Sequence, residues 1–168
     1  MSVRLGRNDI VDVMWGPGIA AFAWIGYMYV GQGVAWLVPL VITIWALRLS
    51  FHIALRMSPR EDARYAAWRR EWVQQGCWYL AARSFLQVFV LQGVLMVAMA
   101  LPAIFAAYLG LGDTFVWWHI IGLAVWFVGF VIESLADWQL ADFMRRKHAG
   151  LESARFYTKG LWGWSRHP

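Results

Sequence analysis

Two carboxylates lie at the start of the first apolar stretch, in the segment RNDIVDVMWG. Asp9 and Asp12 are three residues apart, so a helix would place them on one face. Asp9 suits a helix N-terminus, where the helix dipole favours negative charge. Asp12 lies about one turn deeper, where an ionisable group among apolar residues is costly and invites a functional role. A structural ion pair and a function at Asp12 both stay open.

A stripe of basic side chains occurs in the segment RLSFHIALR. Arg48, His52 and Arg56 recur every four residues and would lie along one helix face. Such a stripe can bind an anionic ligand, which makes all three candidate contacts to a substrate or a phosphate. The alternative is structural, with His52 and Arg56 extending to lipid headgroups. Arg48 would then pair with Asp12 or Glu133, which lie at similar depth.

A third polar cluster lies in the segment IESLADWQLADFMRRK. Glu133 and Asp137 share a helix face, and carboxylates there can accept hydrogen bonds from the hydroxyls or amides of a polar cofactor. Arg145 and Arg146 follow them and suit phosphate groups, although basic residues at this place can also serve only as a membrane anchor.

Several chemistries find no support in the sequence. It contains no P-loop, no GxGxxG, no GxSxG and no HxxxH. Its single cysteine, Cys77, excludes an internal disulfide, and four scattered histidines form no plausible metal set. We therefore expect neither a metal nor nucleic acid as a ligand.

The elements that carry these residues are those of a membrane protein. The sequence is 61% hydrophobic and 15% charged, whereas a soluble domain has roughly 25% charged residues. A bilayer core requires about 20 apolar residues in a helix. Four stretches qualify, which predicts an all-α transmembrane bundle with these spans: Ile10–Val30, Val34–Ile53, Phe85–Leu109 and Phe115–Asp142.

The basic residues predict an orientation for these four spans. Fourteen of the fifteen Lys and Arg lie before the first span, between spans two and three, or after span four. The positive-inside rule then places both termini and the 54–84 segment in the cytoplasm. Within that segment, Ser58, Pro59 and Glu61 resemble the start of a helix. Its aromatic residues suggest a helix lying along the headgroups.

Five segments, taken in order, resemble the bacterial DUF1295 branch of the steroid 5α-reductase superfamily: NDIVDVMWG, EDARY, SFLQVFVLQG, IESLADWQLADF and GLWGWSRHP. The resemblance covers nearly the whole chain. It implies a single membrane domain over residues 1–168, in a bacterial inner membrane. It also implies an NADPH-dependent enzyme that reduces a carbon–carbon double bond of a lipophilic enone.

The resemblance also implies roles for particular residues. Asp12 is the nearest match to the catalytic acid of the characterised reductases, whereas the tyrosine paired with that acid falls near Trp45. An Asn-x-x-x-Asp pair that contacts the cofactor matches Glu133 and Asp137, so Asp137 carries over better than Glu133. The remaining cofactor contacts that we expect are Arg145, Arg146, Arg166 and His167.

The family pattern continues beyond GLWGWSRHP, so we expect this chain to be C-terminally truncated and inactive alone. Two other functions stay open. Arg-His-Pro also occurs in membrane methyltransferases that use S-adenosylmethionine and act on isoprenylcysteine or phospholipids. A non-enzymatic membrane scaffold would use the buried charges only as an ion-pair network.

Overall fold

The computed structural model describes residues 7–57, 61–109 and 114–165, and these residues are helical with no strand. They form two compact units, residues 1–114 and 115–168, which we describe separately. The first unit contains α2 (Ile10–Val13), α3 (Trp15–Val30), the 3₁₀ helix η1 (Gly33–Trp36), α4 (Leu37–Arg56), α5 (Ala63–Val73), α6 (Cys77–Arg83), the π-helix η2 (Ser84–Val90) and α7 (Leu91–Leu109). The second contains α8 (Trp117–His148) and α9 (Leu161–Trp164).

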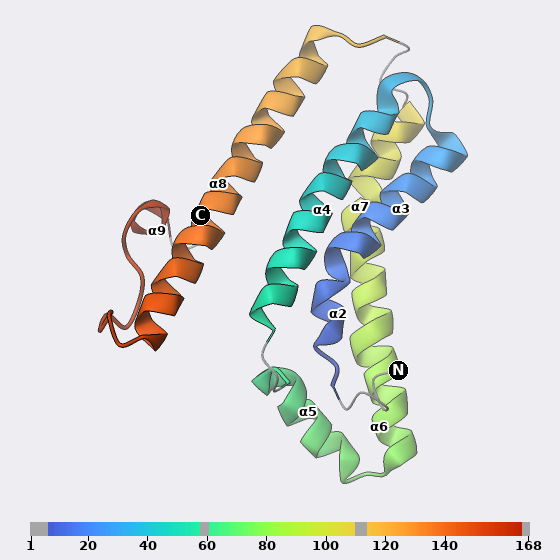
Figure 1. The fold of residues 1–168 in the computed structure, drawn as a ribbon. Coiled ribbons are helices and arrows are strands. Elements are labelled where there is room, and N and C mark those ends of the chain that lie inside the picture. The colour runs from blue at the N-terminus through green and yellow to red at the C-terminus, as the bar shows by residue number, and fades with distance from the viewer. Residues whose placement is uncertain (1–6, 58–60, 110–113, 166–168) are drawn as a thin grey trace. The chain divides into compact units, whose positions relative to one another are not determined.

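Helix α3 packs between α4 and α7, and small residues allow the close approach (Figure 1). A Cβ atom on Gly16 would lie 2.6 Å from the carbonyl oxygen of Ala46 in α4. A Cβ atom on Gly26 would lie 2.6 Å from Ile104 in α7. Membrane helices associate in this way, because small residues let two backbones come into van der Waals contact.

A break at Met14 separates α2 from α3, and Pro17 explains it. Pro17 has no N–H, so it cannot donate the helical hydrogen bond to the carbonyl of Val13. The hydroxyl of Ser50, on α4, donates to that carbonyl instead, at 2.8 Å. A neighbouring helix thus satisfies the backbone group that the proline leaves without a partner.

Helix α5 lies across the end of the bundle and connects α4 to α6 (Figure 1). The side chain of Asp62 caps its N-terminus by accepting from the N–H of Arg64 at 2.9 Å. Tyr65 and Trp72 are buried in the core with Val11, whereas Trp68 is 40% exposed. The helix that the sequence places along the headgroups therefore also packs into the bundle. Ser58 and Pro59 lie outside the described residues.

In the second unit, the chain after α8 folds back along it. The N–H of Leu161 donates to Gln139 Oε1 at 3.1 Å, and Trp162 Nε1 donates to the carbonyl of Ala136 at 2.9 Å. The ring of Tyr157 packs on Phe143, with 5.1 Å between centroids. These contacts fix the return segment (residues 151–165) to one stripe of α8.

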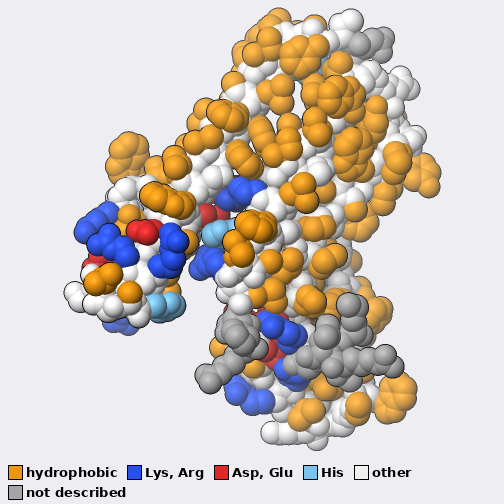
Figure 2. Space-filling view, in the orientation of Figure 1, with side chains coloured by type: hydrophobic (Ala, Val, Ile, Leu, Met, Phe, Trp, Pro, Cys, Tyr) orange, Lys and Arg blue, Asp and Glu red, His pale blue; other side chains and the backbone are white. Residues whose placement is uncertain are grey.

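The apolar surface and helix lengths indicate a membrane protein. Three helical stretches are long and apolar enough to span a bilayer: Gly33–Arg56, Cys77–Leu109 and Trp117–His148. Side chains along them are exposed and hydrophobic, and charged groups gather toward the α5 end of the first unit and the C-terminal end of α8 (Figure 2). Large apolar surfaces of this kind face lipid rather than water.

The expected number of spans is confirmed only in part. Helix α3 has 16 residues, about 24 Å at 1.5 Å per residue, which is short of a hydrocarbon core of about 30 Å. The four-span topology and the cytoplasmic termini therefore stay predictions. The third span begins earlier than expected, because α6 and η2 continue into α7 and extend that helix back to Cys77.

Candidate functional site

A carboxylate and a phenol meet in the first unit. The hydroxyl of Tyr65, on α5, donates to Asp12 Oδ1 at 2.8 Å. The other carboxylate oxygen of Asp12 lies 4.0 Å from the guanidinium of Arg64. Asp12 therefore contacts Tyr65 and Arg64 of α5. The sequence had suggested either an ion pair with Arg48 or a functional role for Asp12.

The environment keeps the phenol of Tyr65 protonated. Burial raises its pKa above the usual range, because the phenolate would lose its hydration, and the hydrogen bond to Asp12 raises it further. Tyr65 is only 5% exposed. The phenol of Tyr65 consequently keeps its proton and donates it to Asp12 in a hydrogen bond.

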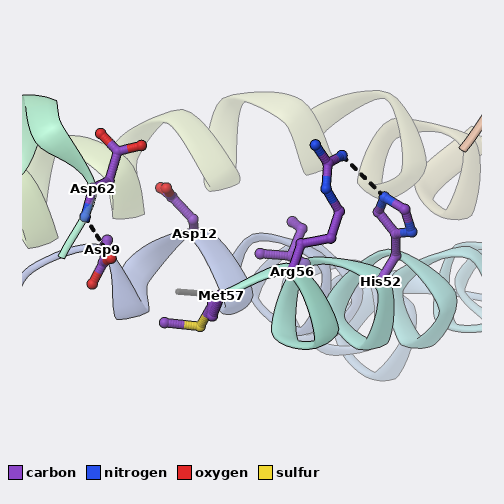
Figure 3. A pocket seen from close by; sticks show the side chains of 7 residues that line it. Asp9, Asp12, His52, Arg56, Met57 and Asp62 are labelled. Carbon is purple, nitrogen blue, oxygen red and sulfur yellow. Dashed lines mark hydrogen bonds between the residues drawn. The ribbon is translucent and has the colours of Figure 1, made fainter. Parts of the chain in front are cut away.

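A polar cavity of about 290 Å³ lies beside this pair. Asp12, His52 and Arg56 form part of its wall, which also includes Asp9, Ile53, Met57 and Asp62. In Figure 3, Asp12 and Asp62 lie toward one side of the cavity, and His52 and Arg56 toward the other. The structure thus brings together Asp12 and two of the three residues in the basic stripe.

An apolar cavity of about 370 Å³ has Asp12 and Ile53 in its wall as well. Its remaining wall is mostly hydrophobic, with Trp15, Ile19, Trp45, Leu49 and Met99, together with Arg64. Asp12 is therefore accessible both from a polar and from an apolar cavity. An amphipathic ligand could occupy both at once, with its polar group near Asp12.

An N-terminal latch, made by residues 7–9, holds the start of α5. Asp9 accepts two hydrogen bonds from the guanidinium of Arg7, at 2.7 and 2.8 Å, and a third from the N–H of Asp62, at 3.0 Å. The N–H of Asn8 donates to Glu61 Oε1 at 2.6 Å, and its side-chain amide donates to Ser84 at 3.2 Å. Glu61 also forms an ion pair with Arg69.

The latch affects the charge of Asp9 and joins distant parts of the sequence. The hydrogen bond from Arg7 lowers the pKa of Asp9, although its burial acts in the opposite direction. In addition, residues 8–9, 61–62 and 84 belong to three of the five segments that resemble the DUF1295 family. Those segments are distant in sequence, and the latch joins them at the α5 end of the bundle.

The basic stripe on α4 is confirmed as a single helical face, because α4 is continuous from Leu37 to Arg56. Arg56 and His52 contact each other, with 3.3 Å between Nη1 and Nε2 (Figure 3). Arg48 lies two turns from Arg56 and is not part of the polar cavity wall. A role for Arg48 in ligand binding stays a prediction.

In the second unit, Glu133 and Asp137 lie on one face of α8, as their spacing predicts. At 100° per residue, Arg145 is about 80° around the helix from Asp137 and Arg146 is about 180° around it. Arg145 lies 3.4 Å from Asp142. Arg166 and His167 lie outside the described residues.

Sequence reasoning missed two residues of this site, Tyr65 and Glu61. It sought a phenol at the position of Trp45 and took Glu61 as part of a helix cap. The available signal was the pair of segments NDIVD and EDARY, because both carry acids near an interfacial helix. Nothing in either segment alone shows that residues 12 and 65 are in contact.

Among the described residues, no three His, Cys, Asp or Glu side chains come together in a group that could hold a metal ion. The carboxylates of the polar cavity are instead close to arginines and to a phenol.

The helical fold and the long apolar helices of the described residues define an integral membrane protein. The chain belongs to the family DUF1295, described as "Protein of unknown function (DUF1295)", which it matches over residues 1–168. "Uncharacterized protein C594.04c" of Schizosaccharomyces pombe is similar, with 24% identity over 189 residues. That alignment covers 100% of this chain and 55% of the relative, so the chain spans about half its length. No solved structure matches the chain.

Proposed function

We propose that this protein is a membrane-embedded reductase that uses NADPH to saturate the carbon–carbon double bond of a lipophilic enone. We place it in a cytoplasmic membrane with its arginine-rich end toward the cytoplasm. The proposal rests on membership of DUF1295, which resembles the steroid 5α-reductases, and on one observation. That observation is the hydrogen-bonded pair of Tyr65 and Asp12 beside a polar and an apolar cavity.

In this proposal the Tyr65–Asp12 pair is the proton source for enone reduction, and Asp12 is the member of the pair that lies in the walls of both cavities. When bound, NADPH supplies a hydride to the β-carbon of the enone. As electron density moves to the carbonyl oxygen, the Tyr65–Asp12 pair provides the proton for that oxygen. The resulting enol tautomerises to the saturated ketone. The apolar cavity would hold the body of the substrate with its carbonyl near Asp12.

Cofactor binding is proposed for α8. Glu133 and Asp137 can accept hydrogen bonds from hydroxyl and amide groups, and Arg145 can pair with a phosphate. The observed contacts of the return segment lie on Ala136, Gln139 and Phe143, about 100–160° around α8 from Asp137. The chemistry of this donor set fits a dinucleotide. Contacts from Arg146, Arg166 and His167 remain part of the proposal.

The first test is cofactor binding by the purified chain in lipid nanodiscs. We expect NADPH to bind, and we expect Asp137→Asn to weaken its binding about tenfold by removing a charge-assisted hydrogen bond. Asp142→Asn is the matched control, because Asp142 lies on the same helix about 140° away from Asp137. Isothermal titration with NADPH and with S-adenosylmethionine measures both affinities.

The contrary result is binding of S-adenosylmethionine without binding of NADPH, which would favour the methyltransferase. Equal losses in Asp137→Asn and Asp142→Asn would remove Asp137 from the cofactor site. Turnover is followed by the mass of the product, which gains one deuterium from labelled NADPH if hydride transfer occurs.

A further inference from the structure

Arg56 projects toward the polar cavity without a carboxylate partner among the described residues. Its observed contact is the His52 ring, and no described acid lies within 4.0 Å of its guanidinium. The Arg56 side chain is exposed, so its guanidinium is accessible to an anion, and arginine binds carboxylate and phosphate groups through charge-assisted hydrogen bonds. The acids in the wall of the same cavity are Asp9, Asp12 and Asp62 (Figure 3).

Each of these three acids has its own partner. Asp9 is held by Arg7 through two hydrogen bonds. Asp62 is held by Arg64, with 3.0 Å between its Oδ1 and the arginine Nε. Asp12 accepts from Tyr65 at 2.8 Å. None of these carboxylates forms an ion pair with Arg56 within 4.0 Å, so its guanidinium is available to an anion that enters the cavity.

The apolar cavity indicates what kind of anion would enter. Asp12 and Ile53 belong to the walls of both cavities, so a single elongated molecule can extend from one into the other. Its apolar part would contact Trp45, Leu49 and Met99. Its charged end would reach Arg56 and His52 across the polar cavity.

We propose that the substrate is an anionic amphiphile whose carboxylate or phosphate binds Arg56 and His52. This inference rests on the proposed function, because the bound molecule is a substrate only if the protein is the proposed reductase. Asp12 then lies between the apolar body and the anionic group, at the place of the reacting carbonyl. Arg56 is a specificity-determining residue, because it selects the charged end and does not act on the reacting atoms.

Native mass spectrometry of the chain released from detergent micelles measures the binding directly. The probes are dodecanoate, dodecyl phosphate, dodecan-1-ol and inorganic phosphate, which separate the charge from the chain. We expect both anionic amphiphiles to bind at least about tenfold more weakly to Arg56→Gln than to the unmodified protein. We expect weak binding of dodecan-1-ol, with no change in that variant.

Arg70→Gln is the matched control, because Arg70 is an exposed arginine on α5 and is not in the wall of either cavity. It should bind both anionic amphiphiles within about twofold of the unmodified protein. An equal loss in Arg70→Gln would overturn the proposal, because the effect would then be surface charge alone. Inorganic phosphate that binds as tightly as dodecyl phosphate would also overturn it.

Leu49→Trp tests the apolar part by filling the cavity wall. We expect it to weaken dodecanoate binding while leaving inorganic phosphate unchanged, and unchanged dodecanoate binding would contradict the two-cavity arrangement. All four probes lack an enone, so their binding is independent of reduction. Arg56-dependent binding of the anionic amphiphiles by a chain that binds S-adenosylmethionine and not NADPH would preserve this inference and reject the reductase.

Discussion

Tyr65 is the residue on which the site most depends, because it supplies the only hydrogen bond from a phenol to a carboxylate in the described part of the chain. Its burial and its contact with Asp12 both favour the neutral phenol. Ionisation at high pH would leave two negative oxygens 2.8 Å apart in a place with little water. The raised pKa is thus a direct consequence of the geometry.

We predict that one tyrosine remains protonated at pH 11, about one unit above the usual tyrosine pKa of about 10. Ultraviolet absorbance at about 295 nm counts phenolates during an alkaline titration. The Tyr65→Phe variant should lack only the late-ionising group. If Tyr65→Phe instead removes a group that ionises near pH 10, Tyr65 is not buried against Asp12.

Stability should depend on this proton in a known direction. A group whose pKa is raised in the folded state contributes its stability below its unfolded pKa. That contribution is lost as the pH rises above about 10 and through the raised folded value.

At the residue scale, sequence alone identified Asp12 but not its partner. An acid within an apolar stretch is visible in any single sequence, because the cost of burying it is local. Tyr65 is 53 residues away from Asp12 and belongs to a helix whose amphipathic pattern suggests only a surface position. The contact depends on how α5 packs beneath the bundle, which no local pattern records.

At the scale of elements, the N-terminal latch determines where α5 begins. Asp9 accepts from Arg7 and from the N–H of Asp62, which is the residue that caps α5. Tyr65 follows one turn later, so the latch also positions the phenol that contacts Asp12.

We predict that Asp9→Asn lowers the free energy of unfolding by about 1–3 kcal/mol, the usual range for a buried hydrogen-bonding group that loses a charged partner. The pKa of Asp9 is lowered in the folded state, so its contribution is present above the usual carboxyl pKa of about 3.9 and lost as the pH falls through the lowered value. Thermal melting in detergent, recorded at pH 7 and at pH 3, measures both effects.

Asp142→Asn is the control for the latch, since Asp142 lies in the second unit and pairs with an exposed arginine. It should melt close to the unmodified protein at pH 7. The difference between Asp9→Asn and the unmodified protein should shrink at acid pH. A difference that stays constant between the two pH values would mean that the charge of Asp9 is not what holds α5.

The ends of a helix can be predicted from the sequence where they coincide with the ends of a hydrophobic run. They cannot be predicted where they depend on the hydrogen bonding of a single backbone group. The helices near residues 37–56, 91–109 and 117–148 follow from hydrophobic runs. The break at Met14 arises because Pro17 leaves the carbonyl of Val13 to Ser50. That exchange requires α4 to lie beside α3, which the sequence of α3 does not reveal.

At the scale of the whole chain, membrane orientation links the polar site to one side of the bilayer. Within the first unit, α3 and α7 run parallel to each other and antiparallel to α4 (Figure 1). The latch joins residues 8–9 to residues 61–62 and 84 at one end of these helices, so the start of α3 lies at the α5 end. The arginines of the 54–84 segment are predicted to face the cytoplasm.

Cys77, the single cysteine, is exposed at the start of α6 and can report this orientation. We predict that a membrane-impermeant maleimide labels Cys77 in inside-out vesicles and not in right-side-out vesicles. In a Cys77→Ser background, Gln32→Cys should show the reverse, because residue 32 joins α3 to α4 at the other end. Ser153→Cys, after α8, should behave like Cys77 if α8 returns the chain to the cytoplasmic side.

The three positions together decide among topologies. Labelling of residues 77 and 153 from one side and of residue 32 from the other requires α4 to cross the bilayer. It also requires an even number of crossings between residues 77 and 153, which is two if both apolar helices of that region span. It would place the polar cavity, and Arg56 with it, where a cytoplasmic cofactor could reach the substrate. If residue 32 is labelled from the same side as residue 77, α4 does not cross. The polar cavity would then no longer lie at a defined membrane surface, and the cytoplasmic reductase would lose its physical basis.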